Sequence, residues 1–526
     1  MKGNPSYKFR ATDRHMKKIE LRTWVFVFIC TALIGRAFAD ASLADAVESR
    51  DSERIQSALS GKVDTDASQV DGMTALHWAA YHDNWKIAKQ LLDKGASPVV
   101  QNRYGITPLY LACVNGNANL VKALIDLGAD ANTEVNGGET VLMTASRTGK
   151  VDAVVALIDA GADVDATERS GQSAMMWAAA EGHVAVVRAL LDAGADFQTP
   201  LGKSGYTPFF FSVREGNTQV VRMLLEAGVD VNAVMHLEKS TGKLPKNGTS
   251  PLLLAVENGH YDLAIELLDL GADPNDDRSG FTILHTLTWI RKPDIGESAN
   301  GDPAPHGSGR RNSDQFIREI VKRGADVNAR LKRGRKAGRG YVADEGATPF
   351  FMAADRADLP YMKLLLELGA DPFVPNRDGC TPLMVAAGLG SRAPEEEAGS
   401  LVECLAVVKF MVALGSDVNV VDANGETAMH GAAYKNAPLV AQYLHEQGAD
   451  IEIWNANNDF GWTPLLIAEG YRPGNFKTSF VTVDVITEIM LSQGVKIPIA
   501  RPKAYNYYGK DPPASDKAKE SKLKKL

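Results

Sequence analysis

Short apolar segments that end in glycine recur along most of the chain. Examples are KIAKQLLDKGA, NLVKALIDLGA and DAVVALIDAGA, which all contain closely spaced apolar residues and close on Gly-Ala. Each one predicts a helix with one apolar face, followed by a glycine suited to a left-handed cap. About twenty residues before the glycine that closes each segment, a second short apolar stretch begins with Thr or Ser. The pattern therefore predicts pairs of short helices.

The starts of these helix pairs repeat at a nearly constant interval. The first five are TALH at 74, TPLY at 107, TVLM at 140, SAMM at 173 and TPFF at 207, spaced by 33, 33, 33 and 34 residues. Six more follow with irregular gaps: SPLL at 250, TILH at 282, TPFF at 348, TPLM at 381, TAMH at 427 and TPLL at 463. A period of 33 predicts a solenoid. One unit buries too little apolar surface to offset its backbone entropy, so the units must stack.

These motifs resemble the ankyrin repeat over about residues 41–497. Eleven units carry the Thr-x-Leu type of start, in which Thr caps the helix and Pro fits its first turn. A degenerate unit, SLADAVESRDSERIQSALSGKVD, precedes them as a terminal cap would. The resemblance implies an all-α repeat solenoid of about 12 stacked helix–turn–helix units with β-turn fingers. It also implies a non-enzymatic scaffold that binds a protein partner through its concave face and fingers, without a cofactor.

The segment TALHWAAYHDN contains two histidines that could suggest a metal site. His77 and His82 are five residues apart, which turns them about 140° away from each other on a helix. The position of His77 is also occupied by Met143 and Phe210 in other units, and a metal ligand would not be interchangeable with these residues. We therefore expect His77 to hydrogen-bond between units.

Positions that vary between units are the candidates for partner recognition. They follow the small-residue pair of each first helix, or come one position before it, and are rich in aromatic and charged residues. The alternative for Trp78, Trp177 and Phe211 is that they fill space between helices. The candidates are Trp78, Tyr81, His82, Asn115, Arg147, Trp177, Glu181, Phe211, Arg214, Glu215, Asn258, Asp355, Arg356, Tyr434 and Lys435.

Motifs for catalysis or metal binding are poorly represented. The sequence STGK at 240–243 fits a nucleophile motif only by chance, and DPNDDRSG at 273–280 lacks the glycine that a calcium loop needs at its sixth place. Cys113, Cys380 and Cys404 do not form a disulfide framework. We expect no enzyme activity, no metal and no cofactor.

The N-terminus has the features of a secretory signal peptide. Basic residues precede the apolar run WVFVFICTALI at 24–34, and a small-x-small cleavage pattern follows at 37–39. Eleven apolar residues fall short of the roughly 20 that a membrane span needs. We expect residues 1–39 to be removed, with Met16 as a possible true start, and the mature protein to be periplasmic or extracellular without a transmembrane span. Removal takes away eight basic and two acidic residues, so the net charge falls from −8 to −14, which disfavours nucleic acid as a partner.

Long inserts interrupt the repeat region, which we expect to span 40–497. They lie near 233–248, 293–313, 331–346, 389–402 and 469–478, and residues 498–526 are expected to form a disordered tail. The segment RLKRGRKAGRG at 330–340 supplies an alternative function, the binding of an anionic surface or polymer. Its basic residues are Arg330, Lys332, Arg333, Arg335, Lys336 and Arg339. The simpler interpretation is a solvated loop, or one that meets the acidic run at 395–397.

Overall fold

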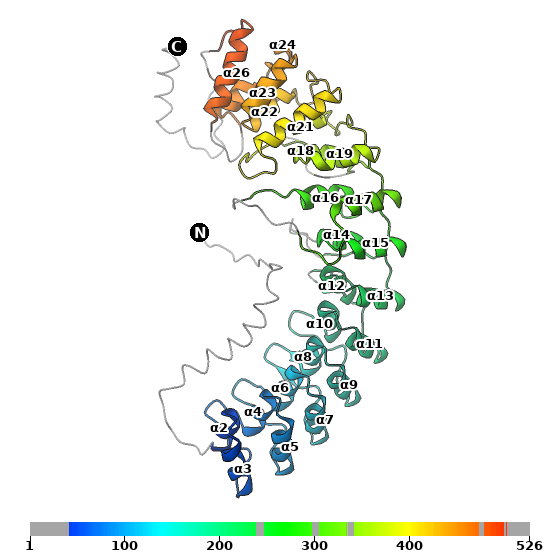
Figure 1. The fold of residues 1–526 in the computed structure, drawn as a ribbon, viewed down its shortest axis with the longest axis vertical. Helices are drawn as coiled ribbons and strands as arrows, with labels where there is room; N and C mark the ends of the chain where they lie inside the picture. Colours follow the sequence, from blue (N-terminus) through cyan, green and yellow to red (C-terminus); the bar gives the residue numbers. More distant parts are fainter. Residues whose placement is uncertain are drawn as a thin grey trace. The chain divides into compact units, whose positions relative to one another are not determined.

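The computed structural model describes residues 42–498 and 501, except 203, 238–246, 297–304, 333, 335–340 and 473–477. The chain divides into two compact units, one ending at Arg169 and the other beginning at Ser170. Within each unit the helices form two layers, an inner and an outer one, and successive helix pairs stack along the chain (Figure 1). The predicted all-α repeat solenoid is confirmed.

The N-terminal unit contains four helix pairs among its described residues. In the inner layer α2, α4, α6 and α8 contact one another in order, and in the outer layer α5 contacts α7 and α7 contacts α9. One finger forms a two-stranded antiparallel sheet, with Glu134 opposite Thr140. The elements are α2 (Ser42–Glu48), α3 (Ser52–Ser60), α4 (Ala75–Tyr81), α5 (Trp85–Asp93), α6 (Pro108–Asn115), α7 (Ala118–Asp126), β1 (Glu134–Val135), β2 (Glu139–Thr140), α8 (Val141–Thr148) and α9 (Val151–Asp159).

The C-terminal unit continues the same alternation of inner and outer helices. Its inner helices are α10 (Ala174–Glu181), α12 (Pro208–Glu215), α14 (Pro251–Glu257), α16 (Ile283–Arg291), α18 (Pro349–Asp355), α20 (Pro382–Ala386), α22 (Ala428–Tyr434) and α25 (Pro464–Glu469). Its outer helices are α11 (Val184–Asp192), α13 (Thr218–Glu226), α15 (Tyr261–Asp269), α17 (Ser313–Lys322), α19 (Leu359–Glu367), α21 (Leu401–Ala413), α23 (Pro438–Glu446) and α26 (Phe480–Ser492). A single turn, α24 (Ile451–Trp454), lies between α23 and α25.

Long connections occur at both ends of these helices. The fingers are long between α13 and α14 and between α17 and α18. The interhelical turns are long between α16 and α17, α20 and α21, and α25 and α26. The fingers and the interhelical turns lie at opposite ends of a helix pair. The long connections therefore follow both ends of the helix pairs in the C-terminal unit.

Local sequence explains why each inner helix begins and each outer helix ends where it does. At the start of α6 the Thr107 hydroxyl accepts a hydrogen bond from the amide of Tyr110 (3.1 Å), and Pro108 occupies the first turn, where no amide donor is missed. After α5, Gly95 adopts a φ of +90°, a conformation that costs glycine little. These caps set where the helices begin and end.

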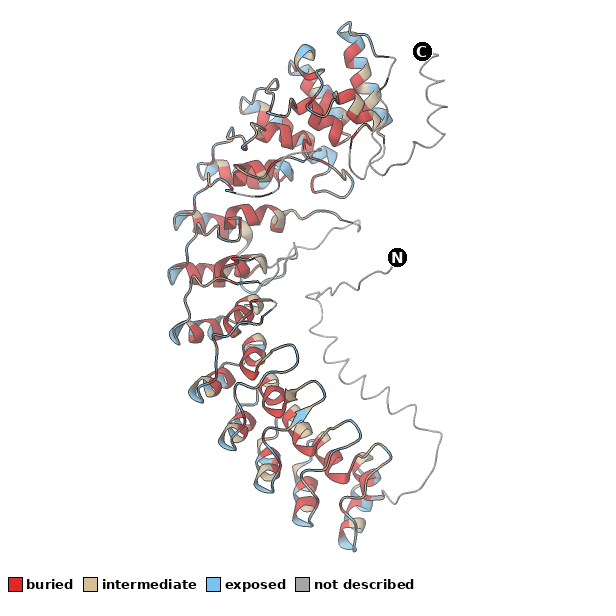
Figure 2. Ribbon diagram, turned by 180° about the vertical axis from the view of Figure 1, so that it is seen from behind, coloured by how far each residue is buried: buried red, intermediate tan, exposed pale blue. Residues whose placement is uncertain are grey.

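The core lies between the two layers and between successive pairs. Leu76 of α4 and Leu91 of α5 are fully buried in the N-terminal unit, and Phe209 and Phe350 are fully buried in the C-terminal unit. Figure 2 shows buried residues along the facing sides of the helices and exposed residues mainly in loops and on the outer layer. Burying these side chains supplies the main driving force for stacking.

The histidine of the repeat motif connects neighbouring units. The His77 ring contacts the Thr74 hydroxyl through Nδ1 (2.8 Å) and the carbonyl of Ile106 in the next finger through Nε2 (2.9 Å). His285 has the corresponding contacts with Thr282 and with the carbonyl of Ala347 (3.1 Å). The predicted hydrogen-bonding role between units is confirmed for His77, and His285 has the same role. Burial lowers the pKa of His77, and lowers that of His285 to about 4, so both rings are neutral at pH 7.

Candidate functional site

The candidate residues of the N-terminal unit gather at the end of α4. Tyr81 and His82 are half-buried, whereas Trp78 is only 6% exposed and donates its indole N–H to Gln69 (2.7 Å). The Trp78 ring stacks on His82 and meets Tyr81 edge-on, with centroids 5.8 and 5.5 Å apart. Trp78 thus supports the cluster from within, and Tyr81 and His82 form its accessible part.

His82 is held in one orientation by the terminal repeat. Its Nδ1 faces the Arg50 guanidinium (2.9 Å) and its Nε2 faces the carbonyl of Glu48 (3.0 Å). Burial lowers the pKa of His82, and Arg50 lowers it further, against the opposing effect of the Glu48 carbonyl. The ring is therefore a neutral, fixed hydrogen-bonding group at the edge of the cluster.

The two remaining candidates of this unit have different surroundings. The Asn115 amide donates to the carbonyls of Ala80 (2.8 Å) and Tyr81 (3.1 Å), so it closes the end of the preceding helix. Arg147 forms an ion pair with Glu139 (3.2 Å), and about a third of each side chain remains exposed. Arg147 therefore presents a positioned charge, whereas the Asn115 amide is used within the fold.

An arginine that packs against two adjacent aromatic rings is the main feature of the inner helices in the C-terminal unit. The Arg214 guanidinium carbon lies 5.2 Å from the centre of the Tyr206 ring and 5.0 Å from that of Phe211. Phe211 is buried, and its ring centre is 5.0 Å from that of Tyr206. Arg214 also pairs with Glu215 (3.0 Å), yet 37% of its side chain stays exposed. The rings fix the direction of the charge and leave it accessible.

Trp177 and Glu181 lie on α10, the inner helix before this cluster. Trp177 is half-buried and Glu181 is exposed at the end of the helix. On the helix after the cluster, the Asn258 amide donates to the carbonyl of Leu254 within its own helix (2.8 Å). The accessible aromatic and charged groups of this part are therefore Trp177, Glu181 and Arg214.

Four candidates near the long interhelical turns mainly support those turns. Arg356 donates to the carbonyl of Lys292 (2.7 Å) and pairs with Asp294 (3.1 Å), while its neighbour Asp355 is exposed. Tyr434 is fully buried, and Lys435, 4% exposed, donates to the carbonyl of Ala398 (3.2 Å). The side chains of Tyr434 and Lys435 are thus not available at the surface of this structure.

The structure also exposes apolar residues on the fingers that the sequence analysis did not single out. Val70 and Tyr104, in two successive fingers of the N-terminal unit, are 67% and 52% exposed, and Phe373 is 48% exposed in the C-terminal unit. The candidates predicted from the sequence all lie on the inner helices or directly after them. The signal that could have identified these residues is an apolar side chain inside a turn sequence, such as NRYG.

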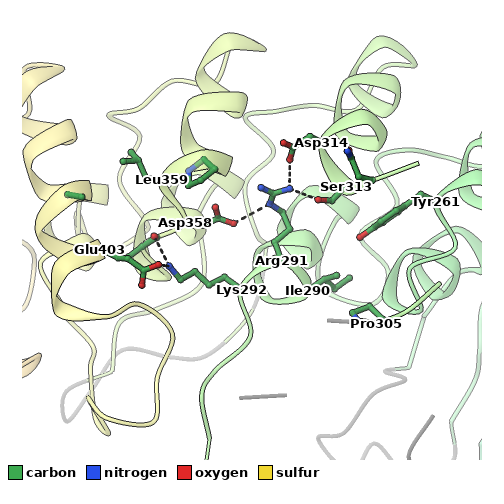
Figure 3. A pocket seen from close by; sticks show the side chains of 14 residues that line it. Tyr261, Ile290, Arg291, Lys292, Pro305, Ser313, Asp314, Asp358, Leu359 and Glu403 are labelled. Atoms are coloured by element: carbon green, nitrogen blue, oxygen red, sulfur yellow. Dashed lines mark hydrogen bonds and ion pairs between the residues drawn. The ribbon is translucent and has the colours of Figure 1, made fainter. Parts of the chain in front are cut away.

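A cavity of about 820 Å³ lies at the interhelical turns of the C-terminal unit (Figure 3). Its walls come from the starts of α15, α17 and α19, the end of α16 and the first turns of α21. Arg291 stands in its centre and pairs with Asp314 (2.5 Å) and Asp358 (3.2 Å), and Lys292 pairs with Glu403 (2.7 Å). These ion pairs link three successive helix pairs, α16 with α17, α18 with α19 and α20 with α21.

The charged groups of this cavity already neutralise one another. Burial opposes the charge of Arg291, but the carboxylates of Asp358 and Asp314 keep its pKa raised. Burial likewise opposes ionisation of Glu403, but Lys292 and the capping Ser400 lower its pKa. A charged ligand would have to break these pairs, so the arrangement favours a structural role for the cavity.

The basic insert is described only at its beginning. Arg330 donates to the carbonyls of Gly346 (3.0 Å) and Pro375 (2.8 Å), and Lys332 pairs with Asp277 (2.7 Å). The other four basic residues, Arg333, Arg335, Lys336 and Arg339, lie outside the described residues. In the acidic run, Glu397 pairs with Lys435. Binding of an anionic partner by this insert stays a prediction.

The predictions on metal sites, membrane spans, cysteines and the two ends of the chain concern residues that the structure describes only in part. No group of three or more His, Cys, Asp or Glu side chains suited to a metal occurs in the ranges that the structure describes, and no helix in those ranges is both long and apolar enough to cross a membrane. Cys113, Cys380 and Cys404 are free and buried. The leader at 1–39 lies outside the described residues, and so does the predicted tail at 498–526 except residues 498 and 501.

Comparison with known proteins identifies the repeat. A family model described as ankyrin repeats (3 copies) matches residues 43–135, 142–235 and 398–477, just over half of the chain. A second model, for the single ankyrin repeat, matches residues 247–278. Among solved structures, the chain is similar to the ankyrin repeat domain of human ASB11, at 22% identity and a TM-score of 0.39, over 51% of this chain and 100% of that one. Between 279 and 397 the helix pairs continue although neither family model matches there.

Proposed function

The chain belongs to the ankyrin repeat family, whose members are in general protein-binding scaffolds, and we propose that it binds a protein partner through the accessible ends of its inner helices and through its fingers, without catalysing a reaction. The proposal is supported by the kind of residue found there. Aromatic and arginine side chains that are fixed but partly exposed are typical of the strongest contacts in protein interfaces. The partner is a folded or extended protein rather than a nucleic acid, because the chain carries a net charge of −8.

The main support for the proposal is the Arg214 cluster, which consists of Arg214, Tyr206 and Phe211. Two aromatic rings hold the guanidinium, and the side chain is still 37% exposed. An arginine fixed in this way loses little conformational entropy when it meets a carboxylate or a carbonyl of a partner. Tyr81 and Arg147 supply the corresponding fixed groups in the N-terminal unit.

Capture of the partner tests the proposal. Proteins that bind the purified chain from an extract of the native cells are identified by mass spectrometry, and the dissociation constant of the best candidate is then measured. The double variants Tyr81→Ala with Arg147→Ala, and Trp177→Ala with Arg214→Ala, are compared with the native chain. We expect at least one of them to weaken binding by a factor of about 10 to 100, the effect of losing one or two central contacts.

The matched control places the same kind of change on the outer layer. Lys122→Ala and Arg188→Ala remove exposed basic residues from α7 and α11, outside the proposed surface. All variants must keep the native helical circular dichroism. If both inner-helix variants bind as tightly as the outer-layer control, the inner surface is not the binding surface.

We further propose that the protein is exported and works in the periplasm or outside the cell. The support is the sequence of residues 1–39, with its basic start, short apolar run and cleavage pattern. Export would bring the inner surface into contact with a periplasmic or extracellular partner. Cell fractionation and the N-terminal sequence of the native protein test this part.

A further inference from the structure

The second residue of each outer helix is a large, exposed apolar side chain only in the last three outer helices of the C-terminal unit. This position is exposed or half-exposed throughout. In the first five outer helices it is occupied by Ala185, Gln219, Asp262, Asp314 and Pro360. In the last three it is occupied by Val402, Leu439 and Val481, which are 75%, 63% and 62% exposed. We call these three residues the apolar rim.

The apolar rim lies on three neighbouring helices. α21 contacts α23, and α23 contacts α26, and all three helices begin at the interhelical end of their pairs. Packed helices are about 8 to 10 Å apart, so the rim extends over roughly 20 Å. α21 and α26 have 13 residues and α23 has nine, so the three residues share the starts of their helices rather than one position of the repeat. Single exposed apolar residues are common on proteins, but three at the starts of adjacent helices indicate a covered surface.

The chain itself returns to this rim after its last helix. α26 begins at the rim and runs away from it for 13 residues, about 20 Å. Arg501 nevertheless forms a two-pronged ion pair with Glu469, through Nε (2.6 Å) and Nη2 (2.6 Å). Glu469 is the last residue of α25, and its carbonyl accepts from the hydroxyl of Thr478, two residues before α26. Residue 501 therefore lies at the same end of the unit as Val481.

The sequence that follows Arg501 suits the apolar rim. Residues 502–508 read PKAYNYY and contain three tyrosines, whereas 509–526 contain six lysines, three acidic residues and no aromatic residue. Seven extended residues reach about 23 Å, which matches the length of the rim. A tyrosine ring can cover an aliphatic side chain while its hydroxyl stays in water.

We propose that residues 502–508 cover the apolar rim of their own chain, through contacts of Tyr505, Tyr507 and Tyr508 with Val481, Leu439 and Val402. The rim is then a second docking surface, separate from the inner helices, and the C-terminal tail is the segment that occupies it. The Arg501–Glu469 pair begins the tail beside the rim, so the effective concentration of the tail is in the millimolar range. A second copy of the chain would need to bury about 800 Å² on each partner, far more than three aliphatic side chains provide.

Disulfide cross-linking in the full chain tests the contact. Leu439→Cys is combined with Tyr507→Cys, and the control combines Tyr507→Cys with Gln219→Cys, which has the same helix position and exposure in α13. Cys30 is changed to Ser in both proteins, and the native cysteines at 113, 380 and 404 are buried and do not compete. We expect the Leu439 pair to close within one chain several times faster than the control, at a yield independent of protein concentration. Equal rates for the two pairs, or disulfide-linked dimers that increase with concentration, would overturn the proposal.

A hydrophobic dye measures the covering directly. The full chain with Tyr505, Tyr507 and Tyr508 all changed to Ser should bind several times more dye than the native chain. Adding Val402→Ser, Leu439→Ser and Val481→Ser to this variant should return the signal to the native level. Leu523→Ser with Leu526→Ser, which removes apolar residues from the tail but keeps the tyrosines, should change nothing. If loss of the tyrosines leaves dye binding unchanged, the tail does not cover the rim.

Discussion

At the scale of single residues, variation between repeats proved an incomplete guide to function. Tyr81, Arg147 and Arg214 vary between units and are accessible, as expected for contact residues. Asn115 and Lys435 vary as well, yet their side chains bond to carbonyls inside the fold. A sequence pattern shows that a residue departs from the repeat. It does not show whether the residue contacts a partner or an irregular part of its own fold, such as the long turn that contains Ala398.

A buried carboxylate gives the C-terminal unit a pH-dependent stability. Glu426 is 4% exposed and accepts hydrogen bonds from Asn458 (2.7 Å) and Tyr434 (3.0 Å). Burial, with a further effect of Asp422, raises its pKa from 4.5 to about 7, although the two hydrogen bonds oppose the shift. Because the folded pKa lies above the unfolded one, this group stabilises the fold fully below about pH 4.5. That contribution is lost as pH rises through 7.

The variant Glu426→Gln should remove this dependence. The shift corresponds to roughly 3 kcal/mol of unfolding free energy, so the variant should be more stable than the native protein at pH 8 by up to about that amount and nearly equal at about pH 4. Urea unfolding followed by circular dichroism at several pH values measures the difference. His285 and His430, whose pKa values burial lowers to about 4, destabilise both proteins equally below pH 6.5. Parallel pH profiles for the two proteins would contradict the assignment to Glu426.

At the scale of helices, the repeat pattern predicted the elements well because caps and periodicity are local. Thr107, Pro108 and Gly95 act where the motif places them. The close approach of α22 to α20 was not predictable, because it depends on the path of the long turn after α20. Gly431 occupies the position of Trp78 in its own repeat. A Cβ there would lie 2.8 Å from the backbone nitrogen of Leu389 and 2.8 Å from the carbonyl oxygen of Met384.

The change Gly431→Ala therefore sets helix propensity against packing. Alanine favours a helix by about 1 kcal/mol over glycine, but its methyl group meets backbone atoms that cannot rotate away. We expect a net loss of roughly 1 to 3 kcal/mol, seen as a lower midpoint of chemical unfolding. Gly61→Ala is the matched control, because this glycine has a negative φ and a Cβ there would meet only the carbonyl oxygen of Ala58 at 3.6 Å. A Gly431→Ala protein as stable as the control variant would show that α20 and α22 are not closely packed.

At the scale of the whole molecule, export has consequences for charge and for cysteine chemistry. Removal of residues 1–39 would change the net charge from −8 to −14. Three thiols would then enter an oxidising compartment, where exposed cysteines form disulfides. Cys113, Cys380 and Cys404 are buried, and burial raises the pKa of each, so they are poor thiolate nucleophiles. The fold is thus compatible with an exported protein that contains free cysteines.

The mature protein should therefore begin at Asp40 and retain three reduced thiols. N-terminal sequencing of native material measures the first, and we expect the sequence DASLADAV. A thiol reagent measures the number of reduced thiols, and should find no reactive thiol in the folded protein and three after unfolding. The change Ala39→Arg, which removes a small residue from the cleavage pattern, should leave residues 17–39 attached and hold the protein in the membrane fraction. A native protein that is found in the cytosol with residues 17–39 intact would rule out export.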